Sequence, residues 1–100
     1  MINHVVLFKL KEYKSDEEKK AALIEIKTSI EALIDKIETV KFIEVGLNHM
    51  LNSKSYDISL ISHFINMEGL DAYRVHPEHL KVLDLINKHV VGRAAVDYEF

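Results

Sequence analysis

The sequence predicts an α+β fold in one domain, residues 1–100, in which a single four-stranded antiparallel sheet carries its helices on one face. Segments with the two-residue alternation of strands and segments with the 3.6-residue spacing of helices occur in the order strand, helix, strand, strand, helix pair, strand. The length of 100 residues is enough for one hydrophobic core and too short for two domains. Apolar residues make up 48% of the chain and charged residues 29%, as in ordinary globular domains.

A first strand is predicted over residues 2–10. His4, Val6 and Phe8 point to one side of it, whereas Val5 and Leu7 point to the other. Because both sides are largely apolar, we expect this strand to be central in the sheet and covered on both faces.

A helix is predicted to follow this strand. Ser15 and Glu18 have the spacing of a capping box, in which a serine and a glutamate three residues later satisfy free backbone N–H groups at a helix start. We expect the helix to run to about Glu38. Its apolar residues recur at helical spacing and predict its buried side: Leu23, Ile26, Ile30, Leu33, Ile34 and Ile37.

The second half of the chain is arranged around its only proline, Pro77. Proline disfavours helix for the residue before it and suits the first position of a new helix, so we expect His76 to be extended and Pro77 to begin a helix. Gly92 is expected to end that helix. Strands are predicted over 40–47, 56–65 and 93–100, helices over 67–75 and 77–89, and a polar loop over 48–55.

This order of elements is the split βαβ arrangement of ferredoxin-like folds. Right-handed crossovers place both helical segments on the same face of the sheet and leave the other face bare. Val5, Leu7 and Ile61, or else the alternate residues of the same strands, would then face water. Burying apolar surface contributes about 25 cal/mol per Å², so a second copy of the chain is expected to cover this face as a homodimer.

Charge and composition exclude several classes of function. The net charge is −3 and the lysines are interleaved with glutamates, so no nucleic-acid-binding surface is expected. The absence of cysteine rules out disulfides and thiol catalysis. The sequence indicates no signal peptide and no membrane span, and a cytoplasmic location is expected. No metal-binding motif is present, and neither a metal nor a cofactor is expected.

The strongest candidates for chemistry are Tyr73 and His79. His79 falls in the first turn of the helix that begins at Pro77, on the same stripe as Leu83 and Ile86. An unperturbed histidine has a pKa of about 6.5 and exchanges protons near neutral pH, whereas a tyrosine, at about 10, acts as a donor. The pair is therefore a candidate general acid and base. The alternative is structural: Tyr73 closes the short helix and His79 bonds a neighbour in the turn.

Two further histidines are candidate ligand-binding residues. His4 lies on the side of the first strand that is expected to face the helices, and it is equally consistent with a core histidine bonded to a backbone carbonyl. His76 precedes Pro77. Because His76 lies before the helix and His79 lies within it, the two rings are not expected to converge on a metal.

Four segments resemble the stress-responsive dimeric α/β-barrel (Dabb) domain over essentially the whole chain: His4-Val5-Val6-Leu7-Phe8-Lys9, Ser55-Tyr56-Asp57, Tyr73-Arg74-Val75-His76-Pro77-Glu78-His79 and Val96-Asp97-Tyr98. The resemblance implies a ferredoxin-like protomer and a homodimer in which two sheets face each other as a barrel. One plant branch of this family, the olivetolic-acid type polyketide cyclases, closes a linear polyketide by aldol condensation without a cofactor.

By position, the tyrosine and histidine that act as acid and base in that branch match Tyr73 and His79. The histidine of its first strand matches His4, and that of its His-Pro step matches His76. A further pocket histidine of the cyclases falls at Ile58 here, which is a departure from their pattern.

Two classes of function remain open from the sequence. One is a protein of undefined biochemical role that binds a small hydrophobic or carbonyl-containing molecule in a pocket between helices and sheet. If this protein is catalytic, it is expected to be a cofactor-independent lyase or cyclase. The other is a non-catalytic dimer with a protective or accessory role. A deep cavity lined by His4, Tyr73 and His79 would favour the first, and a filled core would favour the second.

Overall fold

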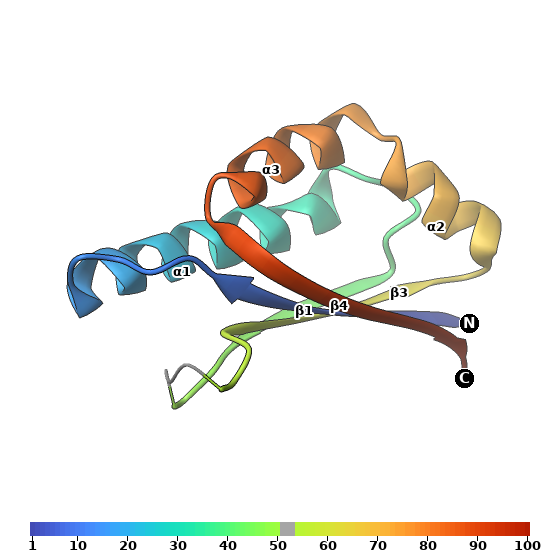
Figure 1. The fold of residues 1–100 in the computed structure, drawn as a ribbon. Coiled ribbons are helices and arrows are strands. Elements are labelled where there is room, and N and C mark those ends of the chain that lie inside the picture. Colours follow the sequence, from blue (N-terminus) through green and yellow to red (C-terminus); the bar gives the residue numbers. More distant parts are fainter. Residues whose placement is uncertain (51–53) are drawn as a thin grey trace.

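The computed structural model describes residues 1–50 and 54–100 as one sheet with its helices on one side (Figure 1). The strands lie in the order β2-β3-β1-β4, and every neighbouring pair is antiparallel. The predicted α+β, ferredoxin-like order of elements is confirmed. In chain order the elements are β1 (Ile2–Leu10), α1 (Asp16–Glu31), a 3₁₀ turn η1 (Ala32–Asp35), β2 (Phe42–Leu47), β3 (Ile58–Phe64), α2 (Met67–Arg74), α3 (Pro77–Asn87) and β4 (Val90–Glu99).

The first strand is central, as predicted. It pairs with β3 on one side and with β4 on the other, so that His4 lies opposite both Ser62 and Asp97. Its even-numbered residues are buried beneath the helices, and its odd-numbered residues from Asn3 to Lys9 are only partly covered. His4 is therefore held on the helix side of the sheet, where it is 5% exposed.

The first helix begins where the sequence predicts and ends earlier. The Ser15 hydroxyl accepts a hydrogen bond from the Glu18 backbone N–H at 3.1 Å, which confirms the N-cap. The regular helix stops at Glu31, not at Glu38, because the chain tightens into η1. A 3₁₀ turn places residues three apart above one another, so Leu33 stays buried while Ile34 is 38% exposed; the prediction of Ile34 as a core residue was wrong.

The predicted role of Gly92 was also wrong. The helix α3 ends at Asn87, where the Lys88 N–H bonds to the Leu85 and Ile86 carbonyls without any residue of positive φ. Gly92 lies inside β4 opposite Lys9, where an added Cβ would come within 3.2 Å of the Lys9 Cβ. The strands β2 and β3 begin later than predicted, at Phe42 and Ile58, whereas β4 begins three residues earlier than predicted, at Val90. The predicted loop over 48–55 lies partly outside the described residues.

The core between helices and sheet consists of two clusters of buried side chains. The first lies beneath α1 and includes Val6, Phe8 and Ile26, and the second lies beneath α2 and includes Phe64 and Tyr73. The partly buried side chains of Ile43 and Val82 pack against both clusters. His4 and Tyr73, two titratable residues that the core buries, line the same cavity beneath α3.

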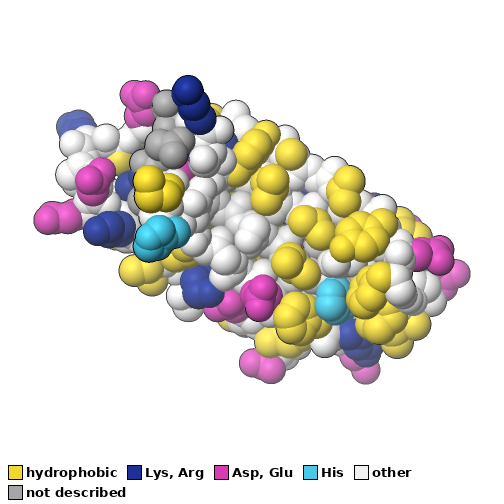
Figure 2. Space-filling view, turned by 90° about the horizontal axis from the view of Figure 1, so that it is seen from below, with side chains coloured by type: hydrophobic (Ala, Val, Ile, Leu, Met, Phe, Trp, Pro, Cys, Tyr) yellow, Lys and Arg dark blue, Asp and Glu magenta, His cyan; other side chains and the backbone are white. Residues whose placement is uncertain are grey.

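The face of the sheet opposite the helices carries exposed apolar side chains (Figure 2). Val96, Tyr98 and Phe100 are 58%, 48% and 60% exposed, and Phe42 on β2 is 40% exposed. The His63 ring lies between two of them, with ring centroids 4.7 Å from Phe42 and 4.7 Å from Phe100. In the part of the chain that the structure describes, none of the helices has the length and apolar character needed to cross a bilayer.

Candidate functional site

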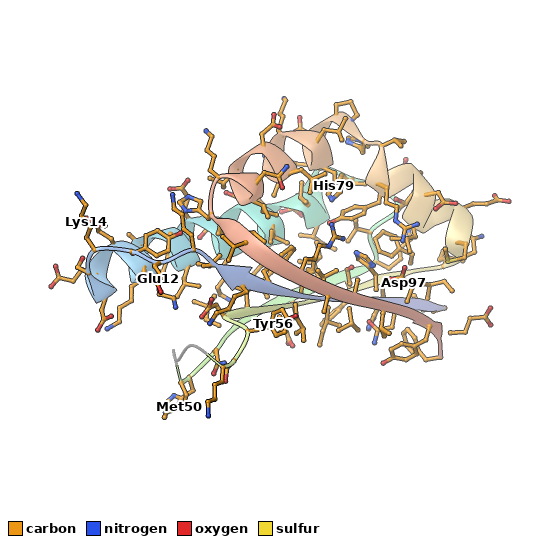
Figure 3. The ribbon with its side chains drawn as sticks, in the orientation of Figure 1. Glu12, Lys14, Met50, Tyr56, His79 and Asp97 are labelled. Carbon is orange, nitrogen blue, oxygen red and sulfur yellow. The ribbon has the colours of Figure 1, made fainter. Side chains whose placement is uncertain are left out.

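A small cavity lies at the seam between α3, the end of α2 and the sheet. Its polar lining comes from four elements: His4 on β1, Tyr73 on α2, His79 on α3 and Arg93 on β4. Its volume is about 20 Å³, which is room for about one water molecule. Figure 3 shows His79 on the helical layer and Asp97 on β4 of the sheet. The apolar walls are Val6, Phe8, Ile30, Leu60, Val82, Leu83 and Ile86.

The His76–Pro77 step brings Tyr73 and His79 together. His76 is extended, with φ −65° and ψ 135°, and Pro77 is the first residue of α3, as predicted. The chain therefore turns between the two helices, and His79 in the first turn of α3 returns over the end of α2. The two ring centroids are 4.2 Å apart at an interplanar angle of 37°.

The protonation state of His79 follows from its hydrogen bond. Its Nδ1 lies 3.1 Å from the carbonyl oxygen of Arg74. A carbonyl only accepts, so Nδ1 carries the proton and the neutral ring keeps its lone pair on Nε2. Burial lowers the pKa of His79; the bond to the Arg74 carbonyl opposes this, and the positive charges of His4, Arg93 and Arg74 add to it. At neutral pH the ring is thus an uncharged proton acceptor.

The neighbouring Tyr73 is a proton donor under the same conditions. Its side chain is 2% exposed, and burial raises the pKa of Tyr73 to about 12, with the positive charge of Arg93 acting in the opposite direction. Within residues 1–50 and 54–100, the Tyr73 hydroxyl has no hydrogen-bond partner. A donor and an acceptor therefore lie side by side at one cavity.

His4 is oriented by a carboxylate, not by a backbone carbonyl. Its Nδ1 lies 2.5 Å from Asp97 Oδ1, and the other oxygen of Asp97 accepts a hydrogen bond from Arg74 at 2.8 Å. Because a carboxylate accepts, Nδ1 of His4 donates and Nε2 is left for the cavity side of the ring or for a further contact. The His4 ring stands edge-on to Tyr73 with centroids 6.3 Å apart.

His76 is placed away from this group. Its Nδ1 accepts a hydrogen bond from the Glu78 backbone N–H at 3.1 Å, so the ring serves as the N-cap of α3. It does not line the cavity. Among the described residues, no three histidine, aspartate or glutamate side chains converge as metal ligands.

A wider hollow lies on the open face of the sheet, at the ends of β2 and β3. Its volume is about 460 Å³, and its lining includes Leu7, Ser59 and Asp57. Asp57 is already engaged, since its Oδ2 accepts from the Leu10 N–H at 2.8 Å and Lys19 Nζ is 3.0 Å from its Oδ1. The smaller cavity is the better candidate site because it joins a proton donor to a proton acceptor.

Comparison with known proteins agrees with this fold. The family model of the stress responsive A/B barrel domain (Dabb) matches residues 2–100. The chain belongs to the Dabb family. No curated protein matches it.

Several solved structures share the Dabb fold of this chain. A dimeric protein of unknown function with a ferredoxin-like fold from Bacteroides fragilis is 40% identical, with a TM-score of 0.88 over 99% of this chain and 95% of that one. A dimeric ferredoxin-like protein of unknown function from Thermobifida fusca is 23% identical, with a TM-score of 0.82 over 99% and 90%. A hydroxynitrile lyase from Passiflora edulis is 13% identical, with a TM-score of 0.79 over 97% and 90%; these last two likenesses concern the fold alone.

Sequence reasoning missed three polar residues around the Dabb cavity: Arg74, Arg93 and Asp97. Asp97 and Arg93 lie on β4 opposite His4 and Phe8 of β1. Their nearness to the cavity depends on the register of two strands about ninety residues apart, for which the separate segments carry no local signal. The alternation of the last strand predicts that Arg93, Ala95 and Asp97 share one face, but only the register shows that this face lies toward the helices.

Proposed function

We propose that this Dabb protein binds a small carbonyl-containing molecule at the cavity between helices and sheet. The Tyr73 hydroxyl donates a hydrogen bond to the carbonyl oxygen, and Nε2 of His79 lies within reach of the carbon beside the carbonyl. One observation carries the proposal: the Tyr73 and His79 rings are 4.2 Å apart at a shared cavity, one as a donor and the other as an acceptor. Ligand sites commonly combine apolar walls with a few polar groups that fix the orientation of the ligand. The seven apolar wall residues and the four polar ones have this composition.

The size of the cavity limits how such a molecule binds. A volume of about 20 Å³ accepts a single oxygen-sized group. The carbonyl oxygen occupies the cavity beside the two rings, and the rest of the ligand lies at the mouth or displaces a wall side chain. Of the cavity-lining side chains, Arg93 is exposed and His79, Val82 and Leu83 are only partly buried, so these side chains have room to move.

Acid–base catalysis without a cofactor is the second candidate, and the pKa values of the pair favour it. Burial raises the pKa of Tyr73 to about 12 and lowers that of His79, so the two groups hold opposite roles at neutral pH. Nε2 of His79 would take a proton from the carbon beside the carbonyl. The electron pair of that C–H bond forms the enolate, whose oxygen accepts a hydrogen bond from Tyr73. This is the proton transfer that a lyase or cyclase requires.

Binding and catalysis are tested with the same small ketones. We expect butanone and levulinate to shift the NMR signals of the Tyr73 and His79 rings, and we expect Tyr73→Phe and His79→Gln to weaken this binding. Tyr56→Phe is the control, because Tyr56 is 39% exposed and does not line the cavity.

Catalysis predicts that the protein accelerates deuterium uptake beside the carbonyl in D₂O, and that His79→Gln abolishes the acceleration. Ketones that leave both rings unshifted would refute the pocket.

We further propose that a second copy of the chain covers the open face of the sheet. Val96, Tyr98 and Phe100 are each about half exposed there, and a contiguous apolar face of this kind marks an interface. The B. fragilis and T. fusca proteins of the same fold are described as dimeric. Two sheets packed face to face would bury Val5, Leu7 and Ile61 in both copies.

A further inference from the structure

Among the described residues that line the cavity, Arg93 is the only lysine or arginine. It lies on β4 opposite Phe8 of β1, and its guanidinium carbon is 5.9 Å from the centre of the Phe8 ring. Phe8 is itself a wall of the cavity. The strand register therefore directs the guanidinium toward the group formed by His4, Tyr73 and His79, on the helix side of the sheet.

The two arginines near the cavity differ in how their charge is balanced. Arg74 is paired with Asp97 at 2.8 Å and with Asp71 at 3.1 Å. Arg93, by contrast, forms no ion pair with any residue in 1–50 or 54–100, and its side chain is exposed. The cavity thus carries one positive charge that no described residue balances with an ion pair.

We propose that Arg93 is the anion-binding residue of this site, and that the ligand is a small carbonyl compound that also carries a carboxylate, an oxo acid. The inference rests on the proposed function, because it names the class of ligand for the same cavity. The planar guanidinium donates two parallel hydrogen bonds to a carboxylate, which a neutral ketone cannot accept. An oxo acid would place its carbonyl oxygen in the oxygen-sized cavity and its carboxylate outside, at the exposed Arg93.

The electrostatics of the site give this arrangement a measurable signature. The charge of Arg93 lowers the pKa of His79. A carboxylate bound to Arg93 cancels that charge, so the pKa of His79 should rise when an oxo acid binds. A neutral ketone in the same cavity lacks this effect, because it leaves the guanidinium charge in place.

The test compares four probes on the full chain by NMR titration of the His79 ring. Pyruvate and levulinate are oxo acids, butanone has the carbonyl alone, and acetate has the carboxylate alone. We expect at least one oxo acid to bind about tenfold more tightly than butanone, the scale of one charge-assisted hydrogen bond pair at an exposed site, and to raise the pKa of His79. Acetate is expected to bind more weakly than that oxo acid.

Variants assign the preference to Arg93. Arg93→Gln should remove the tenfold preference for the oxo acid over butanone, and Arg93→Lys should restore part of that preference, because the charge returns without the planar pair of donors. Lys88→Gln is the matched control: it removes the same charge from the end of α3, outside the cavity, and should leave the preference intact.

The outcomes separate this inference from the proposed function. Equal binding of butanone and the oxo acids, or a preference that survives Arg93→Gln, overturns the role of Arg93 and leaves the pocket standing. A preference that Lys88→Gln removes as fully as Arg93→Gln does would reduce the effect to net charge and would also overturn it. If none of the four probes shifts the His79 ring, the proposed pocket fails, and the inference fails with it.

Discussion

At neutral pH, the His79 ring carries one proton, on Nδ1, and donates it in a hydrogen bond to the Arg74 carbonyl. The ring gains a second proton and a positive charge as the pH falls. Burial lowers the pKa of His79 in the folded chain below the ordinary value of about 6.5 for an unfolded chain. The folded state therefore binds the proton less readily than the unfolded state does. The stability that depends on the neutral ring is complete above the unfolded pKa, and it is lost as the pH falls through the lowered folded pKa.

We predict that the NMR titration of His79 has its midpoint below about 6.5. We also predict that the free energy of unfolding falls between pH 7.5 and pH 5 by more in the parent chain than in His79→Gln. Denaturant unfolding at the two pH values measures the difference. A midpoint at or above that of an unfolded histidine would contradict the burial argument, whatever the stability shows.

At the scale of one element, the N-terminus of α3 depends on His76. The ring accepts from the Glu78 N–H, one of the groups that a helix start leaves without a partner. We predict that His76→Ala lowers the free energy of unfolding by about 1 kcal/mol, the usual contribution of an N-cap. His76→Asn should retain most of this contribution, because asparagine is also a good N-cap. Ketone binding should be the same in both variants, since His76 does not line the cavity. If His76→Asn lost ketone binding while its free energy of unfolding stayed the same, His76 would be a ligand-binding residue.

The junction of β1, β3 and α1 depends on Asp57, which is fully buried just before β3. Its carboxylate accepts from the Leu10 N–H, and Lys19 Nζ lies 3.0 Å from Oδ1 as an ion pair without hydrogen-bond geometry. Lys9 Nζ lies 3.7 Å from Oδ2.

We predict that Asp57→Asn lowers the free energy of unfolding by about 3 kcal/mol, because the lysines would then face a neutral group in a buried place. Asp84→Asn, at an exposed position of α3, is the control and should change it by less than about 0.5 kcal/mol. Chemical denaturation measures both. Equal and small effects would mean that the charge of Asp57 does not contribute to the junction.

At the scale of the whole molecule, the open face of the sheet decides the oligomeric state. We predict a homodimer that Leu7→Asp weakens, because Leu7 lies at the middle of β1 on that face and a buried unpaired charge costs several kcal/mol. Ile24→Asp is the control: Ile24 is 60% exposed on α1, so the same change should leave the dimer intact.

Sedimentation at micromolar concentration measures the association of the parent chain and of both variants, together with their melting temperatures. A parent chain that sediments as a monomer would refute the dimer. A dimer whose mass and melting temperature survive Leu7→Asp would show that another surface joins the copies.

The sequence predicts the parts of this molecule whose causes are local. Ser15 caps α1 and Pro77 begins α3 because caps and prolines act on their immediate neighbours. The Tyr73 and His79 rings lie close together because only the turn at His76 and Pro77 separates their two helices. The family assignment, the α+β fold and the element order are confirmed by the structure and the comparisons.

What the sequence did not reveal depends on distant parts of the chain. The partner of His4 is Asp97, and only the β1–β4 register brings the two together. Ile34 is exposed because the helix tightens at η1, and no glycine or proline in the sequence marks the position of this change. The homodimer of this chain, its cytoplasmic location, the roles of the site residues, and the absence of a metal, cofactor or nucleic-acid partner stay predictions.

The central place of β1 has a consequence for the synthesis of the chain. The strand β1 is paired on one side by β4, which is synthesised after the other three strands of the sheet, and Met1 and Phe100 exchange backbone hydrogen bonds at 3.1 and 3.0 Å. Until β4 has been synthesised, the β1 edge that β4 covers remains an open row of amide and carbonyl groups, to which a neighbouring nascent chain can pair. Completion of this sheet therefore waits for β4, and a chain that lacks β4 exposes one edge of its central strand.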